Sequence, residues 1–116
     1  MDHHHQVLDD LRAPTKDLHR AAPEVMKGFG ALHQAAMADG EIPGALKECI
    51  ALAISVTKHC DGCIAYHARG AAKAGATQGQ VAEAIGVAVL MEGGPATIYG
   101  PRAWEAFLEF SEEATT

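Results

Sequence analysis

Apolar residues recur along this chain three or four positions apart, which is the spacing of an amphipathic α-helix. Strict alternation of apolar and polar residues, the pattern of a β-strand, is absent over five or more positions. The first clear helical stretch covers residues 23–38. It opens at Pro23, which suits a first helical turn, and ends at Asp39-Gly40. The apolar positions that predict it are Val25, Met26, Phe29, Leu32 and Ala36.

Two further helices are predicted on either side of a short break near residue 60. Pro43 opens one that runs to about Lys58. Its apolar residues cover most of its circumference, which is typical of a buried helix. The other covers residues 62–74, with Asp61 as its candidate N-cap and Gly75 as the residue that ends it.

The last two predicted helices are separated by Glu92-Gly93-Gly94-Pro95. Thr77 and Gln80 form a capping-box pattern for a helix from Gln78 to Met91. The final helix carries an apolar stripe made of Trp104, Phe107 and Leu108. Together these patterns predict an all-α fold, a single domain over residues 1–116 built as a bundle of about five to six helices.

The two ends of the chain are predicted to be flexible. Residues 1–13 are mostly polar, with some helical spacing, and residues 112–116 form a polar tail. The short run His3–His5 belongs to the first of these segments. We interpret this run as part of a flexible terminus, with incidental metal affinity as the alternative.

Composition narrows the classes of function. The 116 residues are 48% hydrophobic and 21% charged, as in ordinary globular proteins, and their net charge is −6. Nucleic-acid binding needs a basic face, so we expect no nucleic-acid partner. No apolar run reaches the ~18 residues of a membrane span, and the first 20 residues lack the apolar core of a secretory signal. We therefore expect a cytoplasmic protein that does not bind membranes.

The abundance of alanine and the low aromatic content of 5% predict a thin core. Small domains with little apolar surface to bury often gain burial by association, so a homo-oligomer is expected. The surface near Val87–Met91 and the stripe with Trp104 are the candidate interfaces, because so small a core cannot cover both. The alternative is a monomer whose helices pack closely.

The residues with chemical potential gather between Glu48 and His67. Cys60, Cys63 and His67 are spaced i, i+3 and i+7, so a helix that begins near Cys60 places them within about 60° of one another. Glu48 precedes Cys60 by twelve residues and reaches the same place if the two helices run antiparallel. The third cysteine, Cys49, lies in the apolar helix, where thiols are usually inert.

This group has the parts of a redox centre. A helix N-terminus and a neighbouring imidazole favour a reactive thiolate, a carboxylate orients the imidazole, and a second thiol converts a sulfenic acid into a disulfide. A zinc site formed by Glu48, Cys60, Cys63 and His67 stays open as an alternative. A thioredoxin-like site is disfavoured, because that motif follows a β-strand.

At these residues the chain resembles the alkylhydroperoxidase D-like proteins of the carboxymuconolactone decarboxylase family. The likeness is carried by the spacing Glu48-x11-Cys60-x-x-Cys63-x3-His67. It extends to Gly40-Glu41-Ile42-Pro43, to Ala71–Ala76 with Thr77-x-x-Gln80, and to Met91-Glu92-Gly93-Gly94-Pro95, and it covers roughly residues 23–98.

The resemblance implies a helical fold that assembles into trimers or hexamers, and a peroxidase or disulfide-reductase cycle. By this likeness, Cys63 attacks a hydroperoxide, Cys60 is its disulfide partner, and Glu48 and His67 relay protons. A thiol or dithiol serves as electron donor, and no cofactor or metal is expected. The family pattern has a histidine directly before the second cysteine, where this chain has Gly62, and His59 is a partial substitute. Lactone decarboxylases of the family lack the cysteine pair, and a lyase or a redox-sensing or zinc-binding oligomer is the alternative function.

Overall fold

The computed structural model describes the backbone of residues 2–115 and the side chains of residues 2–112. Within that part of the chain there are six α-helices and no strand, which confirms the predicted all-α class. The helices are α1 (His3–Ala21), α2 (Pro23–Met37), α3 (Gly44–Thr57), α4 (Asp61–Ala74), α5 (Gln78–Glu92) and α6 (Ala96–Thr115).

Local signals account for most of the helix ends. The capping box before α5 is present, with Gln80 N–H donating to Thr77 Oγ1 at 3.1 Å and Thr77 N–H donating to Gln80 Oε1 at 3.0 Å. Gly75 ends α4 in the left-handed conformation, with φ of 85°. One prediction was wrong. The N-cap of α4 is Cys60, whose Sγ accepts the Cys63 N–H at 3.2 Å, and Asp61 is the first helical residue.

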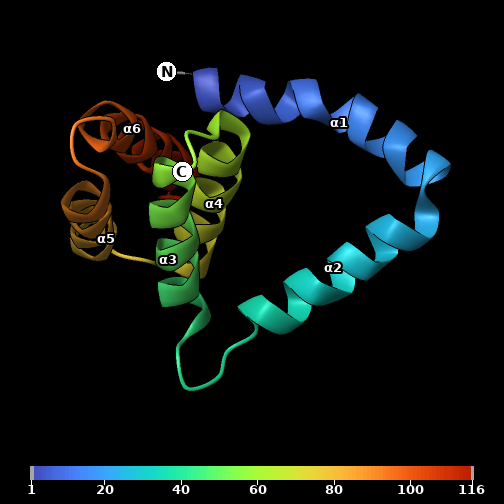
Figure 1. Ribbon diagram of the computed structural model, residues 1–116, viewed down its shortest axis with the longest axis horizontal. Coiled ribbons are helices and arrows are strands. Elements are labelled where there is room, and N and C mark those ends of the chain that lie inside the picture. The colour runs from blue at the N-terminus through green and yellow to red at the C-terminus, as the bar shows by residue number, and fades with distance from the viewer. Residues whose placement is uncertain (1, 116) are drawn as a thin grey trace.

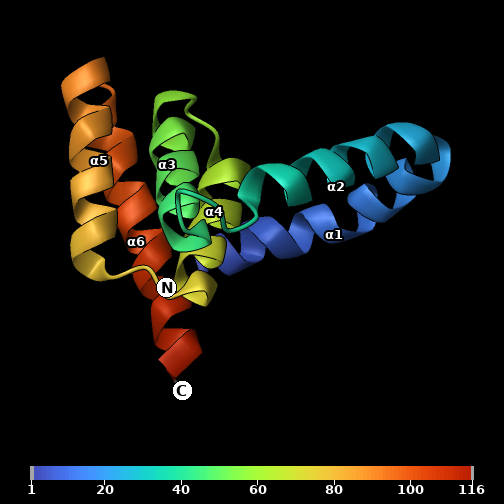
Figure 2. The same ribbon diagram turned by 90° about the horizontal axis from the view of Figure 1, so that it is seen from below.

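Helices α3 to α6 form the bundle that contains the core (Figures 1 and 2). Large apolar side chains fill its centre, and fully buried alanines on α4 and α6 let these two helices approach closely. The buried core residues include Leu52, Val56, Ile64, Val81 and Phe107, with Ala65, Ala68, Ala71, Ala103 and Ala106 between the helices.

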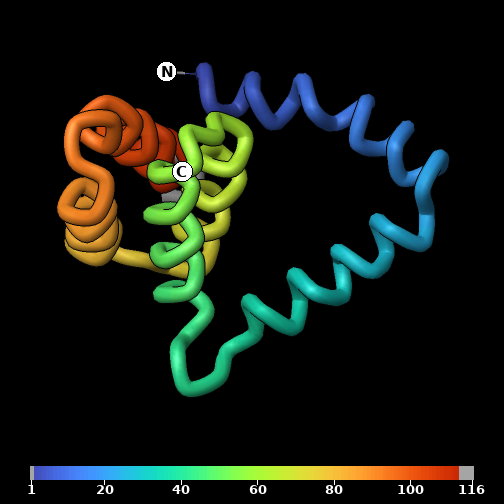
Figure 3. Tube along the Cα trace, viewed as in Figure 1, coloured from blue at the N-terminus to red at the C-terminus, as the bar shows by residue number. Residues whose placement is uncertain are grey.

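Helices α1 and α2 extend from this bundle as a two-helix arm. The tube in Figure 3 shows that they meet at one turn and diverge, with the start of α1 beside the bundle and the end of α2 leading back to α3. Ala22 is the residue at that turn, where its N–H donates to the carbonyl of Leu18 at 2.8 Å. Helix α1 therefore packs against α4, and α2 packs against α3.

The prediction of a flexible terminus is wrong for residues 3–13, because these residues form the first part of α1. His4 is fully buried, and Glu109 of α6 accepts the backbone N–H of His5 at 2.8 Å and that of His4 at 3.4 Å. Burial alone would raise the pKa of Glu109. The two backbone hydrogen bonds and a further one from the His5 ring outweigh the effect of burial, so the pKa of Glu109 is lowered. A carboxylate distant in sequence thus caps α1. The expected flexible stretch 112–116 lies mostly outside the side chains that the structure describes.

The two candidate interface surfaces differ in the structure. Phe107 is 2% exposed, and Trp104 and Leu108 are half-buried, so the stripe on α6 belongs to the core. On α5, Leu90 and Met91 are 79% and 77% exposed. The expectation that the core cannot cover both surfaces is confirmed, whereas the homo-oligomer stays a prediction.

Among residues 2–115, no helix combines the length and the apolar character that crossing a bilayer requires.

Candidate functional site

The cysteine pair lies where α4 begins. Cys60 and Cys63 are joined by a disulfide, with their Cα atoms 5.2 Å apart. Cys63 is exposed, and Cys60, the N-cap residue, is half-buried. The first backbone N–H groups of a helix and the positive end of its dipole stabilise negative charge, so this position favours a thiolate when the pair is reduced.

Glu48 and His67 face each other across the contact between α3 and α4. These helices are antiparallel (Figure 1), which places Glu48, one turn into α3, beside the middle of α4. The Oε1 atom of Glu48 lies 2.9 Å from Nδ1 of His67, and the two side chains are 14% and 20% exposed. The predicted antiparallel pairing, and the meeting of this carboxylate with this imidazole, are confirmed.

A glycine makes room for the carboxylate. Gly70 lies on α4 one turn after His67, and a Cβ atom built at this position would overlap the carboxylate of Glu48. Gly70 therefore lets the carboxylate lie against the backbone of α4 while it holds His67. This requirement was not predicted from the sequence, because it depends on the distance between two helices.

We expect Gly70→Ala to lower the free energy of unfolding, although alanine is the better helix former. The added methyl group must displace the Glu48 carboxylate, and overpacking of this kind costs roughly 1–3 kcal/mol. Gly86→Ala is the matched control, since a Cβ atom there meets nothing within 4 Å, and it should be neutral or stabilising by up to about 1 kcal/mol. Urea unfolding measures both variants. Equal stabilities would contradict the close approach of Glu48.

A cavity of about 560 Å³ lies beside the cysteines, between α4 and the two helices of the arm. Its wall is largely apolar, and Cys60, Cys63 and His67 line it on the side of α4. This volume is that of a small-molecule site. The arm supplies the opposite wall, which includes Leu11, His19, Met26, Phe29 and His33.

Two residues considered from the sequence lie outside this cavity wall. Cys49 is 4% exposed, and burial, with the nearby charge of Glu48, raises the pKa of its thiol. A buried thiol with a raised pKa forms little thiolate, so the low reactivity of Cys49 stays a prediction. The ring of His59 stacks on Tyr99 of α6, and its Nε2 atom lies 2.9 Å from Oε2 of Glu92, the last residue of α5. The idea that His59 replaces the missing histidine at Gly62 has no support in this arrangement.

In the disulfide form Cys60 and Cys63 have no thiolate to bind a metal, so the zinc alternative concerns the reduced pair and stays open. Among the residues that the structure describes, a cluster of potential metal ligands is formed by His3 and His4 at the start of α1 and Asp61 at the start of α4.

The comparisons with known proteins agree with this geometry. The sequence pattern of the carboxymuconolactone decarboxylase family matches residues 23–108, a span that contains the cysteine pair and the Glu48–His67 pair. The chain belongs to this family.

Relatives within the family cover most of the chain. A crystal structure of a carboxymuconolactone decarboxylase family protein from Legionella pneumophila superimposes with a TM-score of 0.93 at 40% identity, over 96% of this chain and 99% of that one. An uncharacterized protein of Cupriavidus necator is 39% identical over 100 residues, 86% of this chain and 88% of its own. Protein 4 of the cox locus of Paracoccus denitrificans, also uncharacterized, is 37% identical over 84 residues, 72% of this chain and 76% of its own.

Two aromatic residues of this family member complete the cavity and were not predicted. The Tyr66 ring makes edge-to-face contacts with His67 and with His33 of α2, at centroid distances of 5.2 and 5.7 Å. The Nε2 atom of His33 is buried and has no hydrogen-bond partner among the described residues. The i, i+3 spacing of Cys63 and Tyr66 was a usable signal for Tyr66. Nothing local marked His33, which meets the site only through the path of the arm.

Proposed function

We propose that this protein is a thiol-dependent peroxidase, a disulfide oxidoreductase that reduces organic hydroperoxides. The observation that carries the proposal is the Cys60–Cys63 disulfide at the start of α4, on the wall of a cavity that His67 also lines. The apolar wall opposite, with Leu11, Met26 and Phe29 among its residues, suits the alkyl part of a substrate.

The proposed cycle starts from the reduced pair. The Cys63 thiolate attacks the outer oxygen of the hydroperoxide, the O–O bond breaks, and the leaving alkoxide takes a proton and departs as an alcohol. The Cys60 thiol then attacks the Cys63 sulfenic acid, so that a disulfide forms and water leaves. His67, held by Glu48, supplies and accepts the protons of these steps.

The cycle closes when a dithiol donor reduces the disulfide and becomes oxidised itself. Such a donor is available in a reducing compartment, in agreement with the expected cytoplasmic location. The exposed apolar side chains of α5 support the proposed homo-oligomer, a trimer or hexamer, because a second subunit would cover Leu90 and Met91.

Mass spectrometry of the intact, reduced chain before and after an organic hydroperoxide tests the proposal. We expect the loss of two hydrogen atoms, with Cys60 and Cys63 linked and Cys49 still open to alkylation after unfolding. The buried Cys49 thiol serves as the internal control, because its raised pKa disfavours reaction. Oxidation of Cys49 before the pair, or an unchanged mass, would contradict the proposed function.

A further inference from the structure

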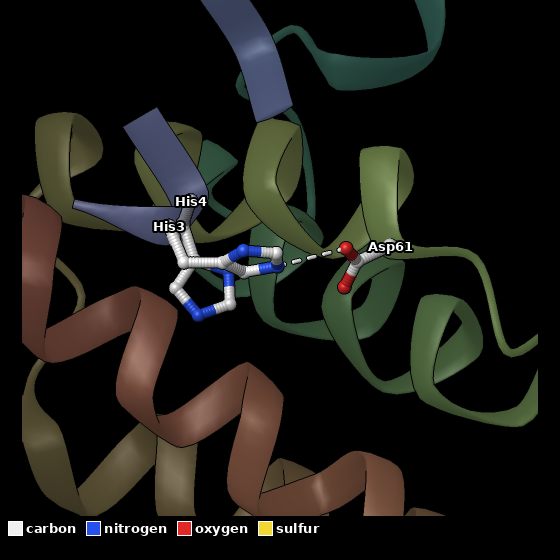
Figure 4. A group of neighbouring side chains, drawn as sticks. All are labelled: His3, His4 and Asp61. Carbon is white, nitrogen blue, oxygen red and sulfur yellow. Dashed lines mark hydrogen bonds and ion pairs between the residues drawn. The ribbon is translucent and has the colours of Figure 1, made fainter. Parts of the chain in front are cut away.

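The start of α1 meets the start of α4 in a cluster of three polar side chains outside the redox cavity wall. Figure 4 shows the rings of His3 and His4 side by side, with Asp61 across from them. Each of the three offers one ligand atom, and these atoms lie within 4.8 Å of one another. His3 and Asp61 are 58 positions apart in the chain, so the fold and not the local sequence brings them together.

One distance in the cluster is close to that between two ligands of a metal ion. His3 Nε2 lies 3.0 Å from Asp61 Oδ2. Two ligands of a tetrahedral zinc ion, each about 2.0–2.1 Å from the metal, are about 3.3 Å apart. A cation can therefore replace the hydrogen bond between this imidazole and this carboxylate with only a small movement of either side chain.

Two buried atoms of the cluster lack a hydrogen-bond partner. They are Nδ1 of His4, whose side chain is fully buried, and Oδ1 of Asp61. Neither finds a donor or acceptor among the residues that the structure describes. Buried polar atoms are rarely left in this state, and an ion is one of the usual reasons.

The groups behind His4 match those behind a metal ligand. Its Nε2 atom lies 2.9 Å from Oε1 of Glu105 on α6. Histidines that bind a metal through one ring nitrogen usually donate the other N–H to a carboxylate, which fixes the tautomer and the ring orientation. With Nε2 engaged by Glu105, the lone pair of His4 Nδ1 is left for a ligand.

We propose that His3, His4 and Asp61 form a binding site for a divalent transition-metal cation. Two imidazoles and one carboxylate suit zinc and the neighbouring metals, whereas calcium and magnesium prefer oxygen ligands only. The three protein ligands leave at least one coordination position open. A bound cation would join α1 to α4 at Asp61, one of the two residues between the cysteines, and so hold in place the helix that carries Leu11 to the cavity wall.

Calorimetric titration of the disulfide form with zinc chloride tests this site, because oxidation of Cys60 and Cys63 removes the competing thiols. We expect one zinc ion per chain in the wild-type protein. Asp61→Asn and His4→Ala should each weaken binding by at least about tenfold, a loss that even a second-shell partner can cause. Asp61→Asn keeps the size of the side chain, and circular dichroism checks that its helix content is unchanged.

The control arms separate a built site from chelation by the histidine run. His5 belongs to the same run, but it pairs with Glu109 and is absent from the cluster, so His5→Ala should bind zinc within about twofold of the wild type. Chelation by a loose run predicts the opposite pattern, with His5→Ala weakened and Asp61→Asn unaffected. That pattern, or no binding of one zinc ion per chain, would overturn the proposal. Cobalt(II) absorption gives a second readout, since loss of the Asp61 carboxylate changes the ligand field.

Discussion

Replacing Cys63 with serine is expected to abolish hydroperoxide turnover, because the change removes the sulfur that we propose attacks the substrate. Cys63 is the exposed residue of the pair, whereas Cys60, the N-cap residue of α4, is half-buried. A serine hydroxyl is a weak nucleophile unless a base activates it. Consumption of an organic hydroperoxide with dithiothreitol as the dithiol measures the effect.

The other two cysteines give this experiment its controls. Cys60→Ser keeps the attacking sulfur and removes its disulfide partner, so one equivalent of hydroperoxide should react and leave a sulfenic acid that dimedone traps. Cys49→Ala should keep its turnover, since the Cys49 thiol is buried among apolar residues. Turnover by Cys63→Ser at the wild-type rate would exclude attack by this sulfur.

Much of the fold was predictable because its helix ends are encoded locally. Pro23, Gly75 and the Thr77–Gln80 capping box act over one turn of backbone, and the helices that they delimit start or end within one or two residues of the predicted positions. The spacing of Cys60, Cys63 and His67 likewise follows from the geometry of a single helix. Antiparallel packing of two consecutive helices then brought Glu48 to His67.

The parts that escaped prediction depend on contacts distant in sequence. The start of α1 is polar, and its sequence does not indicate a core position, yet His4 is buried. Its ring nitrogen Nε2 pairs with the carboxylate of Glu105, 101 positions away, and Glu109 accepts the backbone N–H groups at the start of the helix. A short stretch of sequence does not reveal hydrogen-bond partners that lie far away in the chain. The same holds for Gly70, whose missing side chain matters only because α3 brings a carboxylate against it.

Glu48→Gln and His67→Asn are each expected to slow oxidation of the cysteine pair by hydroperoxide by about 10²–10⁴-fold, the usual worth of general acid–base assistance. Glu48 holds the Nδ1 side of His67 at 2.9 Å, so the neutral amide would leave the imidazole without its charged partner. Because the two residues act as a unit, the double variant should be little slower than either single variant. Stopped-flow measurement of the oxidation step gives these rates directly.

A second histidine–glutamate pair in this chain provides the matched control. His59 and Glu92 lie at the same 2.9 Å separation, but their side chains are outside the cavity wall, so Glu92→Gln should leave the oxidation rate unchanged. A purely structural role for the Glu48–His67 pair predicts a different outcome. Glu48→Gln and His67→Asn would then lower the thermal stability and leave the oxidation rate unaltered. Such a result would contradict the proton relay and would leave the cysteine pair at the start of α4 as the whole reactive site.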